Sequence, residues 1–238
     1  MTNKANAARN EQLALCGDDQ LTPQILHEIA DASTRGRAVL LPTGAAYERP
    51  EHFAERALES VKNAGGTIET LSVVDRRTAM DEGVARQVAE ASCIWIAGAS
   101  ALHVCSTLKG TPVLEAIRSA LGSGALVIGS SGGATCLADP MVDARGGAFT
   151  LGLGLVHGLA IVTGAERQTP EYRKRSVEMA PADVLFVYLP LASALLHKGG
   201  QWSVEGDGVE ASRAGAQLLV ADLPALLPAL AAAVSADN

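Results

Sequence analysis

The sequence is poor in aromatic side chains: its 238 residues include three phenylalanines, two tryptophans and three tyrosines. Proteins that bind single-stranded nucleic acid stack bases on aromatic rings and hold the phosphates with basic side chains. Here Asp and Glu outnumber Lys and Arg by 26 to 19, and no basic run offsets the net charge of −7. We therefore expect no nucleic-acid partner and a core built from aliphatic side chains.

Cysteine is also scarce, and its spacing excludes the common metal and disulfide frameworks. Cys16, Cys93, Cys105 and Cys136 are scattered along the chain without a C-x-x-C pair. This pattern favours reduced, mostly buried thiols over a zinc site or a disulfide-bonded secreted domain. We expect neither a metal nor a cofactor.

No segment has the pattern of a signal peptide or a membrane helix. Residues 1–12 have no apolar centre, and we expect residues 1–10 to be flexible. Residues 120–138 are uncharged, but their repeated Gly and Ser are typical of a strand followed by a tight turn rather than of a membrane span. The expectation is a cytoplasmic protein with no membrane contact.

Short apolar runs alternate with longer amphipathic segments, which predicts an α/β fold with a mostly parallel sheet between two layers of helices. No internal repeat or linker divides the chain, so we expect one domain over residues 1–238. Gly-containing turns between short strands at 193–196, 201–204 and 217–221 predict a small antiparallel extension near the C-terminus. The other predicted strands are 12–16, 37–42, 67–74, 93–96, 125–128 and 184–189. One predicted helix begins at Pro23, and the others cover residues 51–64, 81–92, 111–121, 170–179 and 224–234.

The sharpest local motif is Gly129-Ser130-Ser131-Gly132-Gly133-Ala134, which follows the apolar strand ALVI and precedes TCLA, a segment able to start a helix. A sharp strand-to-helix turn needs small residues around a central side chain that projects from crowded backbone. Ser131 would then be an exposed nucleophile, and the Gly132 N–H would form part of an oxyanion hole. The alternative is a plain Gly/Ser turn or an anion-binding nest.

At this motif the sequence resembles the S51 serine peptidases, the family of cyanophycinases and aspartyl dipeptidases (peptidase E). GSSGGA is similar to the family's nucleophile turn, and STLKGTPVLEAIRSAL resembles the segment before it. GLGLVHG and LPLASALLHKGGQWSVEGDGV resemble later family segments in the same order. The resemblance spans most of the chain and implies a three-layer fold like that of class I glutamine amidotransferases. It also implies a substrate among small Asp-containing peptides or cyanophycin-type bonds.

The sequence departs from the family pattern at three places that the resemblance marks as functional. The family's Phe-x-Gly-Gly-x-Gln segment falls on residues 96–101, so Gly98 and Ala99 take the oxyanion-donor positions while the glutamine position holds Ala101. The segment with the catalytic histidine falls on residues 162–165, which are VTGA. The later acidic residue falls at about Leu191. The turn with its serine is kept, whereas the expected base, acid and glutamine are not.

A serine hydroxyl needs a base within hydrogen-bond reach to become a good nucleophile. His103, His157 and His197 are the candidates for a relocated base. The family register brings His103 nearest, because it follows the strand at 93–96 and open α/β sheets place their sites at the carboxyl ends of the strands. The alternative for His103 is an ordinary histidine on a helix face, and His157 fits a turn. His27 and His52 lie on amphipathic helices and are expected to be solvated.

A charged run between residues 166 and 175 contains two further candidates, Arg173 and Arg175. Their guanidinium groups match the geometry of a substrate carboxylate. The competing interpretation is a solvated helix face with paired charges, the usual role of such runs.

Three functional hypotheses remain open at this stage. The first is a serine hydrolase of the S51 type with Ser131 as nucleophile. The second is a catalytically silent homologue that binds a small acidic ligand or serves assembly, because the family His, Glu and Gln positions are not retained. The third is an esterase or acyl-transfer enzyme that uses the same turn. The Ala- and Leu-rich closing segment also leaves a homodimer open.

Overall fold

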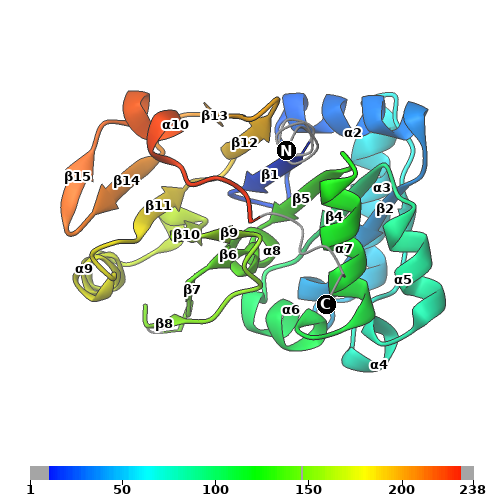
Figure 1. The fold of residues 1–238 in the computed structure, drawn as a ribbon, viewed down its shortest axis with the longest axis horizontal. Helices are drawn as coiled ribbons and strands as arrows, with labels where there is room; N and C mark the ends of the chain where they lie inside the picture. Colours follow the sequence, from blue (N-terminus) through cyan, green and yellow to red (C-terminus); the bar gives the residue numbers. More distant parts are fainter. Residues whose placement is uncertain (1–10, 146, 232–238) are drawn as a thin grey trace, which may run out of the picture.

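The computed structural model describes residues 11–145 and 147–231, so the expectation for residues 1–10 lies outside the described part. Its central feature is a seven-stranded sheet with the order β13-β12-β1-β5-β4-β2-β3 (Figure 1). Strands β1 to β5 run parallel, and β12 and β13 add an antiparallel pair at one edge. The strands are β1 (Gln12–Cys16), β2 (Ala38–Leu41), β3 (Glu69–Thr70), β4 (Cys93–Ile96), β5 (Leu126–Ser130), β12 (Ala194–Lys198) and β13 (Gln201–Glu205).

Helices cover both faces of this sheet because its strands are apolar on both sides. Along β1, Leu13 and Leu15 belong to one buried cluster, whereas Ala14 and Cys16 belong to another. Such double-sided burial is typical of parallel strands between two helical layers. The second cluster contains α2 (Pro23–Arg35) and α3 (Pro50–Asn63), and the first contains α5 (Glu82–Ala89), α6 (Ala101–Leu108), α7 (Pro112–Gly122) and α8 (Gly132–Leu137). The short helix α4 (Arg76–Ala79) precedes α5.

A second, mixed sheet with the order β15-β14-β11-β10-β6-β9 packs beside α8. Leu159 and Leu185 of this sheet share one buried cluster with Leu13 of the central sheet. The strands are β6 (Ala138–Asp139), β9 (Val156–His157), β10 (Leu159–Thr163), β11 (Leu185–Leu189), β14 (Glu210–Arg213) and β15 (Ala216–Leu218), with β7 (Met141–Val142) and β8 (Phe149–Thr150) as a separate pair. The remaining elements are α9 (Pro170–Met179), α10 (Leu223–Leu226) and the short helices η1 (Thr43–Ala45), η2 (Ala165–Arg167) and η3 (Val220–Asp222).

The predicted fold class is confirmed: a mostly parallel sheet lies between helices, with antiparallel strands near the C-terminus. Four local predictions were wrong. The strand predicted at 67–74 shortens to β3, because the chain turns into a capping box at Asp75. The helix predicted at 224–234 is limited to α10, since Pro228 disfavours a helical conformation at Leu227, and residues 232–234 lie outside the described part.

The other two errors concern α6 and β15. The helix α6 was missed, although its buried residues Ala101, Val104, Cys105 and Leu108 have helical spacing. The strand predicted at 217–221 ends as β15 at Leu218, and the chain then enters η3. β15 also pairs with β14 in the second sheet rather than with the antiparallel edge of the first.

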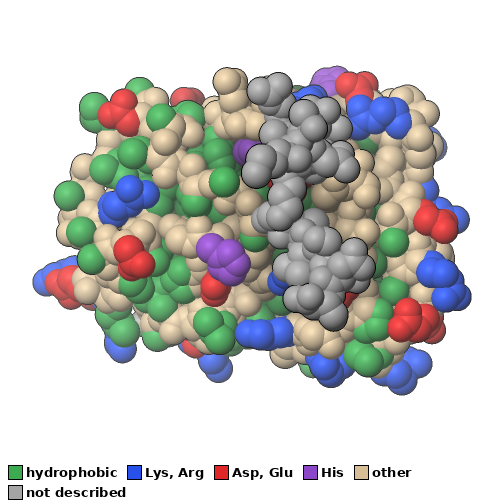
Figure 2. All heavy atoms as spheres, viewed as in Figure 1, with side chains coloured by type: hydrophobic (Ala, Val, Ile, Leu, Met, Phe, Trp, Pro, Cys, Tyr) green, Lys and Arg blue, Asp and Glu red, His purple; other side chains and the backbone are tan. Residues whose placement is uncertain are grey.

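The surface drawn in Figure 2 carries positive and negative side chains in alternation, with no large area of one sign on that face. In the described residues, no helix is both long and apolar enough to cross a membrane.

Leu13 provides a test of the packing between the two sheets, because its side chain is fully buried in their shared cluster. We expect Leu13→Ala to lower the free energy of unfolding by about 2–5 kcal/mol, through lost burial and the cavity it leaves. Leu151→Ala is the control, since Leu151 is 65% exposed and a surface change stays within about 0.5 kcal/mol. Urea unfolding measures both, and equal midpoints would contradict this packing.

Candidate active site

Three chain segments meet at the carboxyl edge of the central sheet because β1, β4 and β5 are parallel neighbours there. The strand β5 leads directly into Ser131, β4 leads into Gly98, and β1 leads into Asp18 and Asp19. The carboxyl ends of parallel strands are where open α/β sheets place their sites. The fold thus collects a serine, two carboxylates and a glycine-containing loop at one edge.

Ser131 has a backbone conformation that side-chain-bearing residues rarely adopt, with φ 50° and ψ −122°. The turn between β5 and α8 is tight enough that a Cβ on Gly132 would lie 2.5 Å from the Ala99 carbonyl oxygen. A Cβ on Gly133 would lie 2.2 Å from the Ile96 carbonyl oxygen. The glycines of the motif therefore allow the close approach of β4, and Ser131 carries the strain of the sharp turn.

Asp19 is the charged group at the centre of this edge. Its Oδ1 accepts a hydrogen bond from the Ser130 hydroxyl at 2.5 Å and one from the Gly98 N–H at 3.1 Å. The Ser130 oxygen also accepts from Trp95 Nε1 at 2.7 Å. Burial raises the pKa of the Asp19 carboxyl, although hydrogen bonds from Ser130, Gly98 and the Ser131 side chain act in the opposite direction.

Sequence analysis missed Asp19 altogether. The Gly17-Asp18-Asp19 run directly after the first strand could have indicated it. In a parallel sheet, the residues after one strand lie beside the carboxyl ends of the neighbouring strands.

Two of the three predicted oxyanion donors are already engaged in this structure. The Gly132 N–H donates to the Gly98 carbonyl oxygen at 3.0 Å, and the Gly98 N–H donates to Asp19. The Ala99 N–H makes no hydrogen bond within the described ranges 11–145 and 147–231. The three groups are thus brought together as expected, but only the Ala99 N–H is unengaged.

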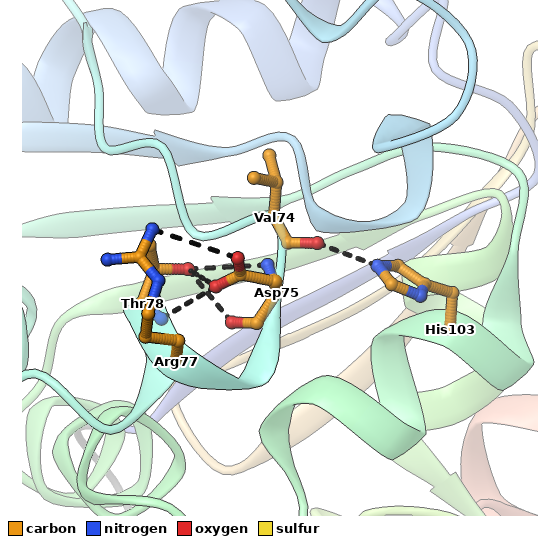
Figure 3. A network of polar contacts seen from close by, with 5 residues as sticks. All are labelled: Val74, Asp75, Arg77, Thr78 and His103. Carbon is orange, nitrogen blue, oxygen red and sulfur yellow. Dashed lines mark hydrogen bonds and ion pairs between the residues drawn. The ribbon is translucent and has the colours of Figure 1, made fainter.

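His103 lies on α6 and its ring is directed at another loop (Figure 3). Its Nε2 lies 2.8 Å from the Val74 carbonyl oxygen and 3.3 Å from the Thr107 hydroxyl. The ring also packs edge-on against Tyr47, with ring centroids 4.8 Å apart. In the part of the chain that the structure describes, no hydrogen bond joins His103 to Ser131, so the base role stays a prediction without support from the geometry.

The other two candidate histidines also have partners outside this edge. Exposed His157 lies 3.1 Å from Asp139 through its Nδ1. Buried His197 lies 3.1 Å from the Glu11 carbonyl oxygen and packs edge-on against Trp202. Burial lowers the pKa of His197, which favours its neutral form. His27 and His52 are both exposed, in agreement with the expectation that they are solvated.

Residues 162–165, on which the resemblance placed the family's histidine, end beside the turn. The Thr163 and Thr135 hydroxyl oxygens are 3.5 Å apart, and the Gly164 N–H donates to the Gly17 carbonyl oxygen at 3.1 Å. A cavity of about 40 Å³ lies there, with Thr135, Thr163 and Gly132 in its wall. Threonine and glycine thus occupy the space in which the resemblance placed an imidazole.

Arg173 and Arg175 lie on α9, and their contacts are with other groups. Arg173 forms an ion pair with Glu210, and its guanidinium lies over the Tyr188 ring at 4.6 Å from the centroid. Arg175 Nε lies 3.4 Å from the sulfur of Met179. No hydrogen bond or ion pair in the described ranges joins either arginine to Ser131 or Asp19, and their substrate role stays a prediction.

A cleft of about 650 Å³ opens beside Asp19, on the side of the sheet covered by α2 and α3. The rings of Phe53 and Trp95 supply apolar wall, and charged side chains of both signs surround them. An ion pair of 3.3 Å joins Arg167 and Asp18 at one end. The charged residues in the wall are Asp18, Asp19, Glu48, Arg56, Glu59 and Arg167.

The four cysteines are buried and form no disulfides. Burial raises the pKa of each thiol, that of Cys93 to about 12, which leaves these groups protonated and unreactive near neutral pH. Within the described ranges, no three His, Cys, Asp or Glu side chains gather as a metal site would require.

The strain at Ser131 generates a prediction about stability. Ser131→Gly and Ser131→Ala both remove the hydroxyl, but only glycine relieves a conformation whose cost is about 1–3 kcal/mol. Glycine also has greater freedom in the unfolded chain, which offsets about 0.4–1 kcal/mol of this relief. We therefore expect Ser131→Gly to be more stable than Ser131→Ala by about 1 kcal/mol. Urea unfolding of the two variants measures this, and a less stable glycine variant would contradict a strained turn.

Comparison with known proteins places most of this chain in a family. Residues 14–165, which include the ends of β1, β4 and β5, match peptidase family S51. Among solved structures, a peptidase from an acI-B1 Actinobacterium superposes with a TM-score of 0.76 at 20% identity, covering 87% of this chain and 96% of that one. A candidate peptidase E protein from Listeria monocytogenes EGD-e superposes with a TM-score of 0.57 at 18% identity, covering 85% of this chain and 98% of that one.

No curated protein sequence matches the chain. The structural neighbours share too little sequence to carry more than the fold, but the family match covers well over half of the 238 residues. The chain, with its serine turn between β5 and α8, belongs to peptidase family S51.

Proposed function

We propose that this protein is a serine-type hydrolase that cleaves small peptides, with Ser131 as its nucleophile. The observation that carries the proposal is the φ of 50° at Ser131. A residue other than glycine in such a conformation costs about 1–3 kcal/mol, and strain of this kind clusters at functional sites. The strained residue is also a serine at the carboxyl edge of the sheet in a member of a peptidase family.

The cleft beside Asp19 supports a small peptide as substrate. Its volume of about 650 Å³ lies within the range of small-molecule sites. Arg56 offers a guanidinium for a substrate carboxylate and makes no side-chain hydrogen bond or ion pair within residues 11–145 and 147–231. Glu48 and Glu59 offer carboxylates for an amino or guanidinium group. Such mixed charge suits a zwitterionic dipeptide, and the candidates are Asp-containing dipeptides and the β-Asp-Arg unit of cyanophycin-type bonds.

We further propose that substrate binding turns the peptide between Gly98 and Ala99. The Gly98 carbonyl oxygen accepts the Gly132 N–H in this structure, which blocks one oxyanion donor. Half a turn of this peptide plane exchanges the directions of its C=O and N–H groups, so the Ala99 N–H would point toward the same space as the released Gly132 N–H. Gly98 already has a φ of 102°, and because glycine has no Cβ it can adopt the backbone angles on both sides of such a rotation. Two converging N–H donors are what a developing oxyanion requires.

A second candidate function is supported by the same hydrogen bonds. If the amides of Gly98 and Gly132 keep their present partners, the site lacks two of its oxyanion donors, and no imidazole within the described ranges hydrogen-bonds to Ser131. The protein would then be a silent homologue that binds a small acidic ligand in the cleft or serves assembly. Reactivity of Ser131 separates the two functions.

The test is labelling of the purified protein with a fluorophosphonate probe, followed by hydrolysis assays with Asp-Xaa and β-Asp-Arg dipeptides. We expect the wild type to be labelled and Ser131→Ala to be unlabelled, because the probe bonds to an activated serine oxygen. His103→Ala should be labelled at the wild-type rate, since its ring contacts Val74 and Thr107 instead of Ser131. Ser119→Ala, at an exposed serine of α7, is the matched control for nonspecific labelling.

Each outcome decides between the functional hypotheses. No labelling of the wild type at any pH between 5 and 9 would overturn the hydrolase proposal and favour the silent homologue. Labelling without hydrolysis of either dipeptide, but with hydrolysis of a p-nitrophenyl ester, would replace the peptide substrate with an esterase or acyl-transfer reaction. Loss of labelling in His103→Ala, with the fold intact, would restore His103 as the base.

A further inference from the structure

We propose that Asp19 is the general base that takes the proton of the Ser131 hydroxyl, so that a serine and a carboxylate replace the serine and histidine of the family. This inference rests on the proposed hydrolase function and names the group on which that function depends. It assigns a catalytic role to a residue that neither the sequence pattern nor the family resemblance singled out.

The position of Asp19 supports this role. The carboxylate accepts a hydrogen bond from the hydroxyl of Ser130, the chain neighbour of Ser131, at 2.5 Å, and the nearby Ser131 hydroxyl acts to lower the pKa of the same carboxyl. It also binds the Gly98 N–H, so the carboxylate lies between the nucleophile and the loop that carries the oxyanion donors. A base must lie within hydrogen-bond reach of the proton it removes, and catalytic hydrogen bonds are often long in a free enzyme and tighten when substrate binds. Asp19 already binds the adjoining Ser130 hydroxyl, so the bond from Ser131 would form as substrate binds.

The other two carboxylates near this edge, those of Asp18 and Glu166, have different partners. Asp18 accepts the N–H groups of Asp19 and Gln20 and pairs with Arg167. Glu166 accepts the N–H of Leu191 on the loop that follows β11. Neither carboxylate contacts Ser130 or Ser131 within residues 11–145 and 147–231. Of these three carboxylates, Asp19 is therefore the one that hydrogen-bonds to the residue next to the nucleophile.

The electrostatic setting makes Asp19 a better base than an exposed aspartate. Burial raises the pKa of its carboxyl above the ordinary value of 3.8, which moves its basicity toward the working range of a hydrolase. The Asp18 carboxylate adds to the increase, since a second negative charge disfavours ionisation of the first. Above its pKa the carboxylate is charged and able to accept a proton.

Asp19 alone can accept and return every proton that the two steps of the reaction transfer. As the Ser131 oxygen bonds to the substrate carbonyl carbon, its proton moves to Asp19 and the negative charge passes from the carboxylate to the carbonyl oxygen. Asp19 then gives the proton to the departing amine as the C–N bond breaks, which leaves an acyl-serine. Water attacks this ester with its proton passing to Asp19, and the proton returns to the Ser131 oxygen as the ester bond breaks.

The test compares Asp19→Asn with Asp18→Asn by their rates of fluorophosphonate labelling from pH 4 to 9. The two substitutions remove the same charge from adjacent residues, but only Asp19 accepts the hydrogen bond of Ser130, next to the nucleophile. We expect Asp19→Asn to be labelled about 10²- to 10⁴-fold more slowly than the wild type, the usual contribution of a general base, and Asp18→Asn to stay within about threefold. In the wild type the rate should decline at acidic pH, through the pKa of Asp19, and this decline should be absent from Asp19→Asn.

A fold control accompanies the rates. Because burial raises the pKa of this carboxyl, its charge costs stability in the folded protein, and asparagine, which keeps an acceptor oxygen, should not lower the midpoint of thermal unfolding at pH 7. A folded Asp19→Asn that is labelled as fast as Asp18→Asn would overturn the base assignment while the hydrolase proposal stands. If Asp19→Asn does not fold, a wild-type rate that is flat from pH 4 to 9 overturns the assignment equally. A wild type that is not labelled at any pH overturns both proposals.

Discussion

The carboxylate of Asp19 connects the ends of three strands, and the arrangement of the site depends on it. Asp19 follows β1, and its oxygen holds the Ser130 hydroxyl at the end of β5 and the Gly98 N–H beyond β4. Trp95 of β4 completes the network through Ser130. These bonds add to the backbone hydrogen bonds between the same segments, which run from the Ser131 N–H to the Cys16 carbonyl oxygen and from the Gly132 N–H to the Gly98 carbonyl oxygen. A buried carboxylate needs such donors, because an ionised group without them would be costly to bury.

The same network sets the chemistry that is open to this family member. Threonine and glycine stand where the family resemblance placed a histidine, and the remaining cavity is only about 40 Å³. A separate cleft of about 650 Å³ has Asp19 in its wall, whereas Ser131 is not among its lining residues. The proposed base is therefore open to the cleft, whereas the positions to which the resemblance assigned the histidine are filled.

Much of the fold could be predicted from sequence because its strands are short apolar runs bounded by clear helix signals. The strands 12–16 and 93–96 and the helix 170–179 were predicted with their observed bounds. The errors fell where one residue decides between two conformations, as at Pro228, or where few residues carry the pattern, as in α6 and β3. The serine turn could be recognised because its glycines are local. Asp19 was missed because its position after a strand does not show which serine it will contact, and that serine, Ser130, lies 111 positions later.

The sequence by itself determined the α/β class, the serine turn and the family, because each depends on residues that are adjacent or regularly spaced in the chain. Tertiary structure alone decided which ionisable group hydrogen-bonds to the end of β5. Parallel strand order brings the end of β1 next to the end of β5, whereas α6 directs His103 toward Val74. That choice depends on strand order and helix orientation, which are set by packing between segments far apart in sequence and cannot be derived from the residues around either group.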